Sequence, residues 1–183
     1  MEDGWAAMRL ERPARESARV RDLGGARQAR DDAQLRHAAQ TSAMSLSEAE
    51  CERLLDSWPV ARLATLANDG RPHLVPIVFA RVGGALWSPI DGKPKSPGVL
   101  ARVRNILRDP RVALLLDHYD ADWEQLWWLR VDGRASLCGA DAGAEAALRG
   151  KYPQYREVPL FAGEPLLLRI DPERVLTWTT SSR

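Results

Sequence analysis

Hydrophobic residues from position 45 onward follow two different periods, and the change between the periods predicts the order of helices and strands. Residues 45–58 carry an apolar side chain at each position of one helical face. The residues that share this face are Cys51, Leu54, Leu55 and Trp58. Two capping boxes overlap at the start of the segment, the second formed by Ser47 and Glu50. The sequence therefore predicts an opening helix, with Cys51 as a small core residue rather than a nucleophile.

Short runs of alternating or continuous apolar residues follow, and turn residues separate them. The strands that we expect occupy residues 60–67, 73–80, 85–90, 111–119, 126–137 and 165–180. Asp69-Gly70 between the first two runs is a strong hairpin signal. Pro76 lies inside the second run and favours an edge strand or a bulge there, because proline lacks the N–H that a ladder needs. Consecutive hairpin-linked strands of this kind close into a barrel, so we expect a mainly β fold with helices.

Two further helices are expected between the strands. Residues 97–108 carry an apolar face, with Ser96 as a favoured N-cap and Pro97 at the first helical position. Asp109-Pro110 ends this helix. Residues 141–152 read as the last helix, with Asp141 near its cap. The expected order is helix, three strands, helix, two strands, helix and strand.

Two acidic turn signals lie inside the longest expected strands. Asp132-Gly133 indicates a bulge in the fifth strand. Asp171-Pro172 indicates a break in the sixth strand, because proline cannot donate to a ladder.

Composition changes near Met44. Residues 1–43 are rich in Ala, Arg, Asp and Glu and poor in large apolar side chains, so they cannot bury enough surface to offset the entropy of ordering. We expect a disordered extension, or a segment upstream of a true start at Met44. Residues 44–183 are expected to fold as one domain.

The overall composition excludes several classes of protein. A net charge of +1 over 183 residues argues against a general nucleic-acid binder. Cys51 and Cys138 lie far apart and lack histidines at ligand spacing, which argues against a zinc site and a disulfide framework. No apolar run approaches the roughly 20 residues that cross a bilayer, and the N-terminus lacks a signal-peptide pattern. We therefore expect a cytoplasmic protein without a membrane or nucleic-acid partner and without a bound metal.

Two lysines precede the expected helix at 97–108. The start of a helix offers unpaired N–H groups and a positive dipole end, and Lys93 and Lys95 lie just outside it. This combination suits a phosphate or another anion. The alternative is that both lysines are solvated side chains in a turn.

No catalytic residue emerges from the remaining polar positions. His73 follows a hairpin turn and His118 ends a strand, so both are expected at a surface or a rim. The chain has no nucleophile elbow and no G-x-G-x-x-G fingerprint for a Rossmann nicotinamide site. Trp127 and Trp128 are consecutive strand residues and must face opposite sides, so one belongs to the core and the other to a cofactor or an interface.

Three segments carry a family resemblance, namely "VARLATLANDGRPHLVPIVF", the lysine-rich stretch before "RNILRDPRVALLL", and "LWWLRVDGRASL". The chain resembles the pyridoxamine 5′-phosphate oxidase-like split-barrel superfamily, and within it the actinobacterial branch of probable deazaflavin (coenzyme F-420) dependent oxidoreductases. The resemblance implies a homodimeric, six-stranded antiparallel split β-barrel of the FMN-binding type, with two flavin-type sites at the subunit interface. It also implies hydride transfer to a small unsaturated acceptor molecule.

The resemblance transfers the family's cofactor-binding roles to particular positions. The phosphate-binding group comprises Lys93, Lys95, Ser96 and Arg102. The ring-contacting strand corresponds to Val75, Pro76, Ile77 and Val78, through backbone groups, and the phosphoribityl-like chain to Trp87 and Ser88.

The chain also departs from the family pattern. Trp128 replaces a polar ring contact of the pyridoxamine oxidases, and Leu100-Ala101-Arg102 replaces their Arg-x-Lys pair. Their C-terminal substrate-binding segment has no counterpart after Trp178. These departures leave FMN as an alternative cofactor, and a non-catalytic flavin- or haem-binding protein as an alternative function.

Overall fold

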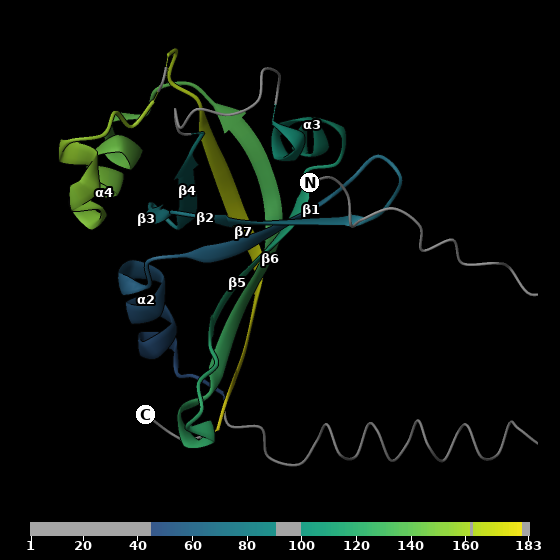
Figure 1. Cartoon of the computed structure of the whole chain (residues 1–183), viewed down its shortest axis with the longest axis vertical. Helices are drawn as coiled ribbons and strands as arrows, with labels where there is room; N and C mark the ends of the chain where they lie inside the picture. Colours follow the sequence, from purple (N-terminus) through teal and green to yellow (C-terminus); the bar gives the residue numbers. More distant parts are fainter. Residues whose placement is uncertain (1–44, 91–99, 162, 181–183) are drawn as a thin grey trace, which may run out of the picture. The chain divides into compact units, whose positions relative to one another are not determined.

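The computed structural model describes residues 45–90, 100–161 and 163–180 (Figure 1). These residues belong to one compact unit, Ser42–Arg183. The expected extension 1–43 lies outside the described residues, and so do Lys93, Lys95 and Ser96.

Within the described ranges, seven antiparallel strands form one sheet in the order β2-β1-β5-β6-β7-β4-β3. The strands are β1 Ala61–Leu66, β2 Pro72–Ile77, β3 Ala80–Val82, β4 Ala85–Pro89, β5 Arg111–His118, β6 Trp127–Cys138 and β7 Leu167–Thr179. β6 and β7 pair along most of their length and run as two long adjacent ribbons in Figure 1. The expected mainly β, antiparallel split-barrel fold is confirmed.

The sheet has one strand more than the expected six. The run 73–80 divides, because β2 ends at Ile77 and a short strand, β3, begins at Ala80. Gly83 and Gly84 both have positive φ, 57° and 80°, which suits a two-residue hairpin turn. The expected turn at 81–84 therefore shortens to these two glycines, and the preceding residues join β3.

The sheet edge and the bulge follow the sequence signals closely. Pro76 lies in β2, which is an edge strand as expected. The register of β6 with β7 shifts between Asp132 and Gly133, which confirms the expected bulge. A Cβ at Gly133 would collide with the carbonyl oxygen of Asp171. The expected break in the last strand is wrong, because the bulge places Pro172 opposite Gly133 and β7 continues through it.

Three α-helices of the described residues accompany the sheet: α2 Glu48–Ser57, α3 Ala101–Arg108 and α4 Ala142–Lys151. Figure 1 draws α2 and α4 on one side of the long strands and α3 on the other. The capping box of α2 is confirmed, since Glu50 N–H donates to Ser47 Oγ and Ser47 N–H donates to Glu50 Oε2. Asp141 caps α4 by accepting from Ala144 N–H at 2.8 Å. Two short 3₁₀ helices occupy Trp123–Gln125 and Pro153–Arg156.

The start of α3 differs from the expectation of residue 97. The helix begins at Ala101, and its N-cap Leu100 has an extended conformation with ψ of 143°. The Leu100 carbonyl accepts from Val103 N–H and Arg104 N–H, which closes the first turn. Because leucine has no side-chain acceptor, the local sequence carries no cap signal at this position. The expected end at Arg108 is confirmed.

Two apolar clusters hold the described part of the chain together. The larger cluster fills the barrel and joins Leu54 of α2 and Ile106 of α3 to the inward side chains of the strands. Trp127 is almost fully buried in it and packs edge-to-face on Trp58, with ring centroids 4.8 Å apart. The smaller cluster packs α4 on β3 and β4 around Trp87. Trp127 is thus the core member of the tryptophan pair, and the apolar face of α2 packs as expected.

The helices in the described ranges are all too short or too polar to span a lipid bilayer.

Candidate functional site

The candidate ring-contacting residues lie along a sheet edge. Val75, Pro76 and Ile77 belong to β2, which within the described ranges pairs only with β1. Val75 and Ile77 lie opposite the buried Leu63 and Ala61, so their side chains face the core. An edge strand leaves backbone N–H and C=O groups available on its open side. Backbone contact with a ligand along β2 is therefore geometrically open.

The register places several polar side chains on the outer face of the barrel. Pro76 pairs with Arg62, which pairs with Leu115, and Asp117 pairs with Trp128. Paired residues share a face, and residues two apart on one strand share it too. Pro76 and Trp128 therefore lie on one face, with β1 and β5 between their strands.

A depression of about 370 Å³ opens on this outer face beside Trp128. Its lining comprises Leu115, Asp117, Tyr119, Trp128 and Arg130. Arg62 Nε forms an ion pair with Asp117 Oδ1 at 3.0 Å, and Arg130 Nε forms another with Asp132 Oδ1 at 2.9 Å. The lining of the depression thus contains an indole, a phenol and paired charges, a set of groups that suits the binding of a flat aromatic molecule.

Trp87 and Ser88 are both buried, at 6 % and 2 % exposure, but they face opposite sides of β4. Trp87 belongs to the cluster under α4, whereas Ser88 lies opposite Leu168 of the barrel core. The buried indole N–H of Trp87 finds no acceptor among the described residues. The two side chains therefore cannot line one ligand chain together, and Trp87 retains an unused donor.

The first turn of α3 is the described part of the expected phosphate site. Within the described residues, no side chain caps this turn and no acidic residue lies in it. Arg102 is its second residue and is half-buried. Lys93, Lys95 and Ser96 precede it in the chain, in the segment outside the described residues. A helix start without a described side-chain cap, beside cationic side chains, favours an anion at this position.

A buried hydrogen-bond chain fixes α3 on the hairpin of β1 and β2. Asn105 Nδ2 donates to Thr65 Oγ1 at 3.0 Å, and Thr65 Oγ1 lies 3.3 Å from His73 Nδ1. Because the Thr65 oxygen accepts from Asn105, its hydroxyl hydrogen can be donated to His73. These hydrogen bonds therefore tie α3 to the strand that carries the candidate ring contacts.

The second histidine is part of the aromatic packing. His118 stacks on Trp127 with centroids 6.4 Å apart, and Trp58 meets its edge at 6.1 Å. Its Nε2 lies 3.9 Å from Asp120 Oδ2. His118 thus has a packing role at the end of β5, and we assign it no catalytic role.

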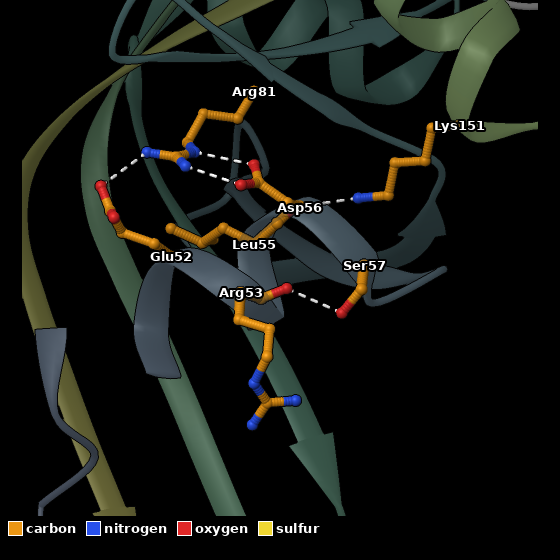
Figure 2. Close-up of polar contacts among 7 residues, drawn as sticks. All are labelled: Glu52, Arg53, Leu55, Asp56, Ser57, Arg81 and Lys151. Carbon is orange, nitrogen blue, oxygen red and sulfur yellow. Dashed lines mark hydrogen bonds and ion pairs between the residues drawn. The ribbon is translucent and has the colours of Figure 1, made fainter. Parts of the chain in front are cut away.

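Charged residues fasten α2 to β3, as Figure 2 shows. Arg81 Nε and Nη2 donate to the two carboxylate oxygens of Asp56 at 2.9 and 2.7 Å, and Nη1 donates to Glu52 at 3.0 Å. The hydrogen bonds from Arg81 lower the pKa of Asp56. Lys151 Nζ donates to the carbonyl of Leu55 at 2.9 Å. This cluster holds the helix in place and adds no reactive group to the outer face.

Sequence reasoning missed the outer-face charges and the fastening of α2. Alternation along residues 60–67 separates Arg62 from its apolar neighbours, and this signal could have marked it. The partners of Arg81 and Lys151 arise only from tertiary contacts. No group of three or more His, Cys, Asp or Glu side chains within the described ranges could hold a metal ion.

Comparison with known families decides the membership of the chain. The family pattern described as pyridoxamine 5′-phosphate oxidase matches residues 47–179. The chain belongs to the pyridoxamine 5′-phosphate oxidase family. A search of curated proteins finds no match.

Solved structures share this family's split-barrel fold. A conserved hypothetical protein of Mycobacterium tuberculosis is 24 % identical with a TM-score of 0.63, covering 77 % of this chain and 89 % of its own. The haem storage protein HutZ of Vibrio cholerae is 18 % identical with a TM-score of 0.59, covering 74 % and 96 %. An F420 reductase is 23 % identical with a TM-score of 0.50, covering 68 % and 94 %. At these identities the likeness shows the fold alone.

Proposed function

We propose that this member of the pyridoxamine 5′-phosphate oxidase family is an oxidoreductase that uses the deazaflavin coenzyme F-420 to reduce a small unsaturated acceptor. The observation that carries the proposal is the first turn of α3, which among the described residues has neither a side-chain cap nor an acidic residue. The turn follows directly after the segment that holds Lys93 and Lys95. The likeness of "DGKPKS", "RNI" and "DPRV" to the F-420-dependent branch supports the choice of coenzyme.

The residues divide into an anion-binding group and a ring-binding group. N–H groups of the first turn of α3, with Arg102, Lys93, Lys95 and Ser96, would hold the phosphate of the coenzyme. Backbone groups of β2 at residues 75–77 would contact the ring along the open sheet edge.

Side chains of this protein would orient the ring and exclude water, while the bound deazaflavin would supply the hydride. The acceptor would gain that hydride and a proton from solvent, so it gains two electrons while the coenzyme is oxidised. Trp128 and Leu115 offer apolar surface on the outer face, where water must be excluded for this step. No described histidine or carboxylate needs to act as an acid or base.

We also propose that two copies of the chain pair through the outer face. Trp128, Leu176 and Trp178 follow one another across β6 and β7 and remain half-exposed, so a partner has apolar surface to cover. Light scattering of the purified protein would then give twice the mass of one chain, and a single-chain mass would contradict the pairing.

Replacement of Lys95 by alanine tests the coenzyme site. A charge-assisted hydrogen bond contributes about 1.5–3 kcal/mol, so Lys95→Ala should weaken coenzyme F-420 at least about tenfold in a fluorescence-quenching titration. The matched control is Arg53→Ala, which removes a cation that points away from the α2 cluster in Figure 2. The control should bind as the parent does, and both variants should unfold at the parent's urea midpoint.

The same purified protein separates the alternatives. A yellow chromophore with flavin absorbance would favour FMN, and a Soret band would favour haem. Equal coenzyme F-420 affinity of the parent and Lys95→Ala would contradict the assigned anion site.

A further inference from the structure

An apolar cavity of about 370 Å³ lies where β1 begins and the segment after β2 ends. Its walls are Pro59, Val60, Val78, Tyr152, Tyr155 and Val158, joined by the amide of Gln154. The volume falls within the range of about 300–1,000 Å³ that small-molecule pockets occupy. Val78 is also one of the candidate ring-contacting residues, so the cavity adjoins the end of the proposed ring strand.

Tyr152 fixes two walls of this cavity through its hydroxyl group. Phe79 N–H donates to Tyr152 Oη at 3.0 Å, and Oη lies 2.9 Å from the Phe79 carbonyl and 3.0 Å from the Pro59 carbonyl. One hydroxyl thereby joins the residue before Val60 to the residue after Val78. Its hydrogen and one lone pair are engaged away from the cavity, and its phenol ring faces the cavity as apolar surface.

Lys151, the last residue of α4, supports the same wall and reaches toward α2. Its Nζ lies 3.8 Å from the centroid of the Phe79 ring and donates to the Leu55 carbonyl, and Figure 2 shows its side chain reaching toward α2. Phe79 has no exposed surface. Adjacent residues of one chain segment therefore hold both the backbone and the ring of Phe79, and the wall at Val78 is held in a fixed place.

The charge of the cavity limits what it can bind. None of its lining residues, all of them in the described ranges, carries a charge. A phosphate-bearing or carboxylate-bearing molecule would lose its hydration there without gaining a partner cation. An uncharged, planar, apolar molecule would instead bury its surface against the valines and the tyrosine rings.

We propose that this cavity is the binding site of the acceptor, and that the acceptor is an uncharged, apolar ring compound; this role rests on the proposed function. The cavity selects against anionic molecules because its described lining offers no cation. Gln154 provides an amide that can donate to or accept from one polar atom of the acceptor.

The test uses two naphthoquinones that differ in charge, menadione and 1,4-naphthoquinone-2-sulfonate, titrated calorimetrically into the full chain without coenzyme. Menadione should bind, and the sulfonate should bind at least about tenfold more weakly, because its charge finds no partner. Val158→Asp introduces a carboxylate at a wall residue that is 49 % exposed, and should weaken menadione at least about tenfold. Val175→Asp is the matched control, since Val175 is 47 % exposed and lines a different depression.

Three results would overturn the inference: no menadione binding, equal affinity for both quinones, or equal menadione affinity of Val158→Asp and the parent. A parallel titration with coenzyme F-420 keeps the two proposals apart. Coenzyme binding with unchanged menadione affinity in Val158→Asp would overturn the cavity assignment alone. Menadione binding that Val158→Asp weakens, without any coenzyme binding, would overturn the proposed function and the acceptor role with it.

Discussion

Removal of one oxygen atom, in Tyr152→Phe, should destabilise the whole barrel. The Tyr152 hydroxyl accepts from the N–H of the fully buried Phe79 and has two carbonyl oxygens within 3.0 Å. In the variant the Phe79 N–H remains buried without an acceptor, which costs about 1–3 kcal/mol. The donated hydrogen bond is lost as well, at about 1 kcal/mol net. The free energy of unfolding should therefore fall by about 2–4 kcal/mol.

Urea unfolding followed by tryptophan fluorescence measures this change, because Trp58 and Trp127 lie in the barrel core. Tyr119→Phe is the matched control, since Tyr119 is 66 % exposed and should change the free energy by less than about 0.5 kcal/mol. Burial raises the pKa of Tyr152 to about 12, so the hydroxyl stays protonated throughout the assay. An unchanged urea midpoint for Tyr152→Phe would refute the argument that this hydroxyl joins the two strand ends.

Two further perturbations test the bulge and the buried lysine. Gly133→Ala should lower the free energy of unfolding by about 1–3 kcal/mol, because its Cβ would collide with the Asp171 carbonyl. Gly139→Ala, where a Cβ meets open space, should leave the free energy of unfolding unchanged. Equal urea midpoints for the two variants would contradict the close packing at the bulge. Burial lowers the pKa of Lys151 to about 8 from 10.5, although Asp56, itself bound to Arg81, opposes the shift. The folded state then binds fewer protons than the unfolded state between these values, so the free energy of unfolding should rise with pH there. Lys151→Met should lose this rise in urea titrations between about pH 8 and pH 10, and a parallel pH dependence of both proteins would contradict it.

Local sequence signals predicted those parts of the fold that depend on neighbouring residues. Ser47 with Glu50, and Asp141, satisfy backbone N–H groups within a few positions, so their patterns are visible in the sequence. Pro76 lacks the N–H that an inner strand needs, so it marks an edge strand by itself. The bulge at Gly133 was predicted for the same reason. The predicted start of α3 was wrong, because Leu100 has no side chain that marks an N-cap in the sequence.

Tertiary contacts decided the features that the sequence did not reveal. Val78 and Phe79 continue an apolar run, yet Tyr152, 73 residues away, holds Phe79 out of the ladder and β2 ends before it. Pro172 is compatible with a continuous β7 because Gly133 on the facing strand leaves room. On the candidate site, the sequence predicted that Trp127 and Trp128 separate, but it placed Trp87 and Ser88 together although they face opposite sides.

The proposed anchoring of a phosphate-bearing ring coenzyme at the start of α3 can be measured in one titration. The purified protein is titrated with coenzyme F-420 and with the same deazaflavin lacking its phosphate-bearing tail, at low and high salt. We expect the complete coenzyme to bind at least about tenfold more tightly, and salt to reduce this difference. Equal affinity for the two molecules at low salt would contradict this anchoring.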